Sequence, residues 1–339
     1  MVKSDFSDYV TAFFSQYLEL QRGLSQNTIA SYSDAFLLLF RYFNDNHNLS
    51  PDKITFAHIT RECVDDYCQW LETSRNSSVK TRNLRLTAIH SFIRYVAMRE
   101  PSRISTFKSI LDIRMKKCEK TMPIHLSDEE VKMLLAEPDF RKKRGIRDLA
   151  ILAVLYDSGV RVSELTSLRI SDVRMCGTTT LRIVGKGRKQ RLVPISSATA
   201  NIIKAYYKAY NTDVSSSNRN LFANSHGEAL TRPGINYILN KYVQQARQNN
   251  PGYFNVKVTA HVVRHSKAVS LLLSEVSLIY IRDFLGHSSV ITTEHYARTN
   301  PEFLRKAIEK NALIYADDTS QYSLQEQHHL IEFLKSFRN

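Results

Sequence analysis

Residues 157–165 read DSGVRVSEL and close a run of apolar side chains at 145–157 that predicts a buried helix. Gly159 can end this helix, and Arg161 follows two residues later. An arginine placed just past a buried helix has a fixed stem, while its guanidinium stays free to bind a ligand. Glu164 begins the next predicted helix and could orient Arg161. The segment therefore predicts a helical domain that presents an arginine at a site.

Two short strands are predicted downstream of this arginine. Residues 179–184 and 191–195 have the β-branched and alternating character of strands, and the sequence GKG at 185–187 marks the turn between them. Lys186 on such a hairpin can reach toward a scissile oxygen, and Lys189 is the neighbouring alternative. This domain is therefore predicted to be α+β, mainly helical with a small antiparallel sheet.

Three further strings complete a set of polar residues that suits phosphodiester chemistry. Arginines can hold phosphate oxygens as bidentate forks, lysines and histidines can transfer protons, and a tyrosine can attack phosphorus. The strings are AHVVRHS at 260–266, LGHSS at 285–289 and TTEHYA at 292–297, which contribute His261, Arg264, His287 and Tyr296. Of these, His261 and Arg264 are three residues apart and would share one face of a helix.

The order and the local strings of these residues resemble the tyrosine recombinase (phage integrase) family. The resemblance covers nearly the whole chain and is strongest over residues 145–298. It is closest to the simple two-domain recombinases of the Xer-like or transposon-encoded type. It implies catalytic roles for Arg161, Lys186, His261, Arg264, His287 and Tyr296.

The resemblance also implies a division of labour among these groups. The two arginines would stabilise the negative charge of a pentacoordinate phosphorane, and His287 would donate a further hydrogen bond. Tyr296 would attack phosphorus with His261 as its base, and Lys186 would protonate the departing 5′ oxygen. The product would be a 3′-phosphotyrosine. A second 5′-hydroxyl can attack this link and reverse the cleavage. No metal and no cofactor is expected.

Residues 1–100 predict an all-helical domain, and the resemblance implies that this domain binds DNA core sites. Apolar residues recur at helical spacing, and Ser25 and Thr60 can cap the second and third of four helices. Basic residues near the start of the fourth helix could bind DNA. They are Lys80, Arg82 and Arg85.

The other predicted segments are a linker at 101–125, a catalytic domain at 126–300 and a tail at 301–339. The linker is basic and is expected to run along the DNA backbone. The tail has an apolar face and is expected to dock on a neighbouring subunit, with packing on its own domain as the alternative. The expected DNA contacts outside the first domain are Arg114, Lys116, Lys117, Lys120, Lys189 and Lys267.

The net charge of +14 is concentrated where the motifs lie. Residues 126–300 carry 25 Lys and Arg against 14 Asp and Glu, whereas residues 1–100 carry 11 of each. Such an imbalance favours a nucleic-acid partner. No apolar run is long enough to span a membrane, and the N-terminal sequence lacks an apolar signal core, so a cytoplasmic protein without membrane association is expected.

The expected partners are double-stranded DNA core sites, bound by a homotetramer on two duplexes. A type IB topoisomerase and a catalytically inert DNA-binding protein of the same fold are the alternatives. A purely structural helical scaffold leaves the GKG hairpin and the paired His261 and Arg264 unexplained. The sequence leaves open whether the reaction serves integration, excision, resolution or transposition of a mobile element.

Overall fold

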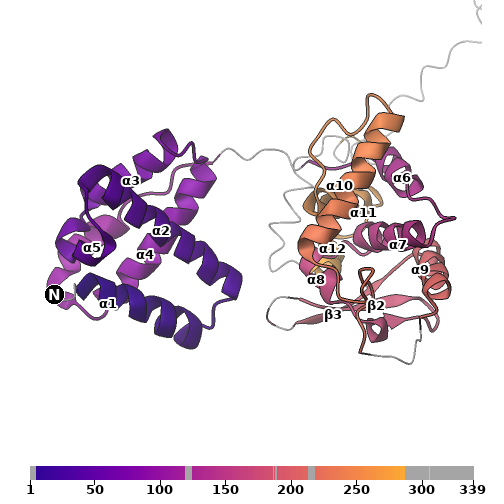
Figure 1. Cartoon of the computed structure of the whole chain (residues 1–339), viewed down its shortest axis with the longest axis horizontal. Coiled ribbons are helices and arrows are strands. Elements are labelled where there is room, and N and C mark those ends of the chain that lie inside the picture. Colours follow the sequence, from indigo (N-terminus) through magenta and orange to yellow (C-terminus); the bar gives the residue numbers. More distant parts are fainter. Residues whose placement is uncertain are drawn as a thin grey trace, which may run out of the picture. The chain divides into compact units, whose positions relative to one another are not determined.

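The computed structural model of the chain describes residues 5–118, 124–185, 187, 189–212, 218–286 and 305. It divides into two compact units, Met1–Thr121 and Met122–Asn339, each of which is described by itself. The first unit is helical and the second joins helices to a small sheet, which confirms the predicted fold class (Figure 1). No helix in the described ranges combines the length and apolar character that a bilayer span requires.

The helices of the first unit begin where the sequence supplies capping side chains. Ser25, Thr60 and Ser78 each accept a hydrogen bond from the backbone N–H three residues later, which satisfies a donor that the first helical turn leaves free. A π-helix continues the first helix without a break. The elements are α1 (Asp5–Ala12), the π-helix η1 (Phe13–Gln21), α2 (Gln26–His47), α3 (Arg61–Thr73), α4 (Val79–Ala97) and α5 (Ile104–Leu111).

Helix α5 lies inside the segment that was predicted to be a linker. Its side chains Phe107 and Ile110 are fully buried against the first unit, and the Phe107 ring packs edge-to-face on Phe56 at 5.8 Å between centroids. His90 of α4 donates a hydrogen bond to the carbonyl of Ile110 at 3.0 Å. The start of the expected linker is therefore folded, because an apolar face covers the core where Pro101 and the basic residues suggested an extended chain.

Side chains of α3 and α4 attach the chain beyond α5 to the first unit. Asn83 of α4 donates from its amide to the Lys116 carbonyl at 2.8 Å and accepts from the Lys116 backbone N–H at 3.1 Å. The Lys116 ammonium lies 2.6 Å from a carboxylate oxygen of Glu72. The expected basic strap is thus anchored to protein at this residue.

The second unit begins at the predicted capping box. Ser127 Oγ accepts from the Glu130 backbone N–H, and the Glu130 carboxylate accepts from the Ser127 N–H. The preceding residue, Leu126, donates its N–H to Ser266 Oγ at 2.8 Å. The helices that follow are α6 (Asp128–Ala136), α7 (Lys143–Asp157), α8 (Val162–Ser167), α9 (Ser197–Tyr210), α10 (Arg232–Asn249), α11 (Ala260–Leu273) and α12 (Leu278–Leu285).

A three-stranded antiparallel sheet lies at one edge of these helices (Figure 1). Strands β2 (Thr180–Val184) and β3 (Gln190–Pro194) form the predicted hairpin, closed by a hydrogen bond from the Gly185 N–H to the Lys189 carbonyl at 2.8 Å. A third strand, β1 (Val173–Arg174), was not predicted, because two residues carry no readable alternation. The ladder of the hairpin therefore extends to Gly185, the first residue of the GKG sequence.

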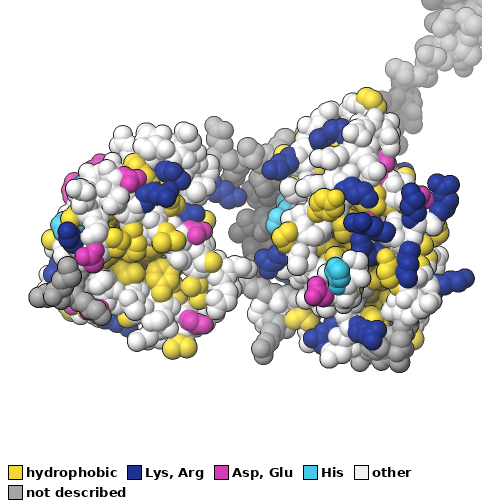
Figure 2. Space-filling view, viewed as in Figure 1, with side chains coloured by type: hydrophobic (Ala, Val, Ile, Leu, Met, Phe, Trp, Pro, Cys, Tyr) yellow, Lys and Arg dark blue, Asp and Glu magenta, His cyan; other side chains and the backbone are white. Residues whose placement is uncertain are grey.

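Helix α7 forms the centre of the second unit and packs against α9 and α11. Its interior residues from Ala150 to Leu155 are all buried, as the apolar run predicted. Figure 2 shows Lys and Arg side chains spread over the visible face of this unit, whereas the visible face of the first unit exposes a broader hydrophobic area. The basic excess thus lies on the surface around a helical core.

Replacing Phe107 with alanine should destabilise the first unit by about 3–5 kcal/mol, because the change leaves a cavity in its core. Trp70, on α3, is the only tryptophan of the chain, so its fluorescence during denaturant unfolding reports on this unit. Ile104→Ala, on the same helix at a side chain that is 60% exposed, is the matched control. Equal stability of the two variants would contradict the place of α5 in this core.

Candidate active site

Arg161 lies between the end of α7 and the start of α8, as the sequence predicted. Gly159 takes a left-handed conformation with φ +56°, which turns the chain out of α7. Arg161 donates its backbone N–H to Glu164 Oε2 and its Nη1 to Glu164 Oε1, both at 2.9 Å. Its Nη2 donates to the carbonyl of Gly286 at 3.2 Å. A third of the side chain is exposed, so the guanidinium is oriented by protein and accessible to a ligand.

His261 and Arg264 occupy the first turns of α11, whose start is capped by Thr259. Arg264 is buried and donates from Nη1 to the Gly159 carbonyl and from Nη2 to the Leu285 carbonyl, both at 2.5 Å. Its Nη1 also lies 4.0 Å from Glu164 Oε2. His261 is exposed. The structure therefore brings the two predicted arginines to one carboxylate.

Glu164 is the centre of this arrangement. The residue is 5% exposed, and burial alone would favour its neutral form. Hydrogen bonds from Arg191 and from the Arg161 backbone outweigh that burial and hold the pKa of the Glu164 carboxyl below its usual value. The lowered pKa keeps the carboxylate ionised at neutral pH among three guanidinia, and the group has a net positive charge.

A small cavity of about 290 Å³ opens beside Arg161. His261 lines it together with Arg232 and Asn236, which the sequence analysis did not single out. Helices α10 and α11 both begin at this cavity, and the N-terminal ends of helices favour anions. An anion placed there would meet Arg161 and the first turns of both helices.

Arg191 of β3 is a third arginine that the sequence analysis missed. Its Nη1 and Nη2 donate to the two oxygens of Glu164 at 3.1 and 2.8 Å. The available signal was its position shortly after the GKG sequence, but Lys186 and Lys189 in the same segment are also basic and are closer to the turn. Lys189 itself is exposed.

Three predicted site residues lie outside the described residues: Lys186, His287 and Tyr296. The structure describes the positions next to two of them. Gly185 follows β2 in the closed hairpin, and Gly286 caps α12 in a left-handed conformation with φ +66°. A helix therefore ends directly before His287.

The basic residues expected at DNA occupy unequal surroundings. Lys80, Arg114 and Lys117 are exposed, and Lys120 lies outside the described residues. Arg82 is 4% exposed and donates to the Arg114 carbonyl, while Arg85 donates to the Ser31 carbonyl at 2.8 Å. Through these hydrogen bonds, both arginines stabilise the first unit itself.

Lys267 also has a partner inside the protein. Its ammonium lies 3.0 Å from Asp157 Oδ1, and both side chains are largely buried. Asp157 accepts in addition from the Ser196 backbone N–H at 2.7 Å. The structure therefore favours a role for Lys267 in joining α11 to the end of α7 over the expected contact with DNA.

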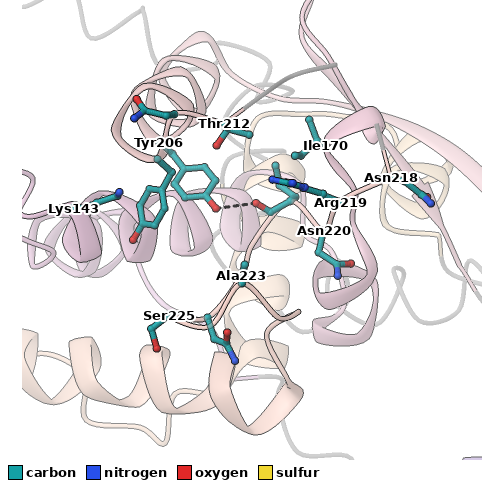
Figure 3. A pocket seen from close by; sticks show the side chains of 14 residues that line it. Lys143, Ile170, Tyr206, Thr212, Asn218, Arg219, Asn220, Ala223 and Ser225 are labelled. Carbon is teal, nitrogen blue, oxygen red and sulfur yellow. Dashed lines mark hydrogen bonds between the residues drawn. The ribbon is translucent and has the colours of Figure 1, made fainter. Parts of the chain in front are cut away.

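A larger cavity, of about 750 Å³, lies elsewhere in the second unit, around the end of α9 (Figure 3). Its wall includes Lys143, Arg219 and Tyr206, whose hydroxyl donates to the Leu221 carbonyl at 3.0 Å. None of the predicted catalytic residues in the described ranges lines it. The smaller cavity at Arg161 is therefore the candidate site.

The stability of the second unit should fall on acidification because of His265. Burial, followed by the charges of His261, Arg264 and His125, lowers the pKa of His265 to about 4. A histidine in the unfolded chain has a pKa of about 6.5, so between these values the unfolded state binds more protons. The stabilising contribution is thus present above pH 6.5 and is lost as the pH falls toward 4.

Thermal unfolding midpoints measured between about pH 7.5 and 5 test this expectation. The decrease on acidification should be smaller in His265→Gln than in the wild type, with His226→Gln, at an exposed histidine of the same unit, as the control. The same decrease in wild type and His265→Gln would refute the assignment.

Two family models match this chain. The model described as the phage integrase family covers residues 124–302, which include the candidate site. The model described as the phage integrase N-terminal SAM-like domain covers residues 12–100. Together they span both units.

Known proteins match over most of the chain. A Sinorhizobium fredii protein, y4rC, provisionally named an integrase/recombinase, is 34% identical over 325 residues, 96% of each chain. Tyrosine recombinase XerD of Staphylococcus epidermidis is 30% identical over 296 residues, 86% of this chain and 95% of the relative. The structure of the XerH site-specific recombinase bound to palindromic difH substrate has a similar fold, with a TM-score of 0.67 at 22% identity over 85% of this chain and 81% of that one. Because the matches extend through both units and across the arginine–glutamate site, the chain belongs to the phage integrase family of tyrosine recombinases.

Proposed function

We propose that this protein is a site-specific recombinase, which cleaves and rejoins DNA through a covalent link between a tyrosine and a 3′ phosphate. The observation that carries the proposal is the convergence of Arg161 and Arg264 on the buried Glu164, beside a cavity lined by His261. Family membership supports the same activity.

The charge of the site suits phosphoryl transfer. A phosphodiester carries one negative charge, and attack on phosphorus adds negative charge to its non-bridging oxygens. The guanidinia of Arg161, Arg191 and Arg264 surround the single carboxylate of Glu164, which leaves an excess of positive charge fixed in place. Preorganised charge stabilises a transition state without reorganisation at the moment of reaction.

The proposed reaction conserves the energy of the broken bond. The Tyr296 oxygen forms a bond to phosphorus, and the bond from phosphorus to the 5′ oxygen breaks. His261 takes the proton of the phenol, Lys186 gives a proton to the departing oxygen, and His287 donates a hydrogen bond to the phosphate. A 5′-hydroxyl from another strand reverses these steps and releases the tyrosine.

The proposed partner is double-stranded DNA that carries short core sites. Solved relatives of similar fold include a lambda integrase dimer bound to a core site and a Tn1549 transposon integrase bound to transposon end DNA. Exchange between two duplexes requires two cuts in each, so we propose a homotetramer on two sites. Exposed basic residues are the proposed contacts: Lys80, Arg114, Lys117 and Lys189.

Tyr296→Phe should abolish the covalent adduct, because phenylalanine has no oxygen to attack phosphorus. A suicide substrate nicked near the cleavage site traps the wild-type protein at a 3′ end, where a gel resolves the adduct. Tyr280→Phe, at a side chain that is 70% exposed, should form it normally. Persistence of the adduct in Tyr296→Phe would overturn the assignment, and its absence from the wild type would favour an inert DNA-binding protein.

Lys186→Ala should cleave ordinary DNA about 10²–10⁴-fold more slowly than the wild type, because no acid then protonates the leaving 5′ oxygen. A 5′-bridging phosphorothiolate should restore cleavage, since a thiol leaves without protonation. Lys189→Ala, on the same hairpin, tests the neighbouring lysine, which is the alternative acid. Equal defects of Lys186→Ala on both substrates would assign the acid elsewhere.

A further inference from the structure

Three consecutive backbone carbonyls at the end of α12 each accept a hydrogen bond from a different arginine. Arg191 Nε donates to Phe284 at 3.0 Å, Arg264 Nη2 to Leu285 at 2.5 Å, and Arg161 Nη2 to Gly286 at 3.2 Å. The last carbonyls of a helix lack partners within the helix and carry its negative partial charge. The arginines that surround Glu164 therefore also cap this helix.

Arg191 is bound to protein through all three of its guanidinium nitrogens. Its side chain is 13% exposed, and its three nitrogens donate to both oxygens of Glu164 and to the Phe284 carbonyl. A planar guanidinium can make these bonds together, whereas an ammonium cannot form the same fork. Arg191 thus joins β3, α8 and α12 at one point.

The glycine at the end of α12 matches this arrangement. A Cβ atom at Gly286 would lie 2.8 Å from Arg191 Nη1, closer than such atoms approach, and the backbone there has φ +66°. Arg191 therefore packs directly on the backbone from which the chain continues to His287.

We propose that Arg191 is a positioning residue for phosphoryl transfer: it holds Glu164 and the end of α12, and thereby holds Arg161 in the geometry that meets the phosphate. This inference rests on the proposed function. Arg191 itself is not proposed to touch DNA, because each of its three nitrogens already donates to a protein group and the side chain is 13% exposed. Its loss should lower the rate of cleavage and leave DNA affinity close to that of the wild type.

Single-turnover cleavage of the suicide substrate at saturating protein tests the proposal. Arg191→Gln should lower the rate by about 100-fold, the effect that a displacement of roughly 1 Å can have. Arg191→Lys keeps the charge and loses the fork, so its cleavage rate should lie between those of Arg191→Gln and the wild type. It replaces Arg191→Gln in the test if that variant does not fold. Arg182→Gln is the matched control, because it breaks another arginine–carboxylate pair in the same sheet, 2.8 Å from Asp172.

Two readouts separate positioning from other roles of Arg191. The double variant Arg191→Gln with Glu164→Gln should lose less than the sum of the two single losses in ΔΔG‡, because the two variants remove the same Arg191–Glu164 contact. The phosphorothiolate that rescues Lys186→Ala should not rescue Arg191→Gln. Additive losses, rescue by the thiol, or an equal loss in Arg182→Gln would overturn the role of Arg191. Absence of any wild-type adduct would overturn the proposed function and this inference with it.

Discussion

The second unit depends on one carboxylate. Three guanidinia cannot be brought together in a poorly solvated place without a counter-charge, because their mutual repulsion adds to the cost of removing each from water. Glu164 supplies that counter-charge and is itself buried among the groups that ionise it. It neutralises one of the three charges, so the remainder is available to a phosphate. A site with a second acid would hold the arginines more firmly and attract the substrate less.

The same carboxylate joins elements that are far apart in the chain. Arg161 precedes α8, Arg191 lies on β3, and Arg264 lies on α11, and all three extend to the end of α12. The core of α7 sets the distances between these elements, because its interior residues are buried and pack on α9 and α11. The geometry of the site is thus a property of the whole unit, whereas the cavity itself is lined by only a few side chains.

Local patterns predicted the parts of this arrangement that are local. The pair Arg161 and Glu164, the shared helix of His261 and Arg264, and the hairpin all follow from spacing within a few residues. The role of Arg191 could not be predicted, because its partners lie 27 and 93 residues away. The burial of Arg82 was equally hidden, since a basic residue on a helix has the same local signature whether it faces solvent or the Arg114 carbonyl. Helix α5 was not predicted, because Pro101 and the basic residues indicated a linker and the apolar face of the helix is short.

The capped end of α12 also determines when the site can exist during synthesis. Arg191 is made 93 residues before the Phe284 carbonyl that it binds, and chains grow at about 5–20 residues per second, so roughly 5–20 s separate the two groups on the ribosome. Through that interval Arg161 and Arg191 lack the carbonyls that hold them, although the first unit is already complete. A nascent or prematurely ended chain can therefore carry the folded first unit before it possesses an assembled centre able to break a DNA strand.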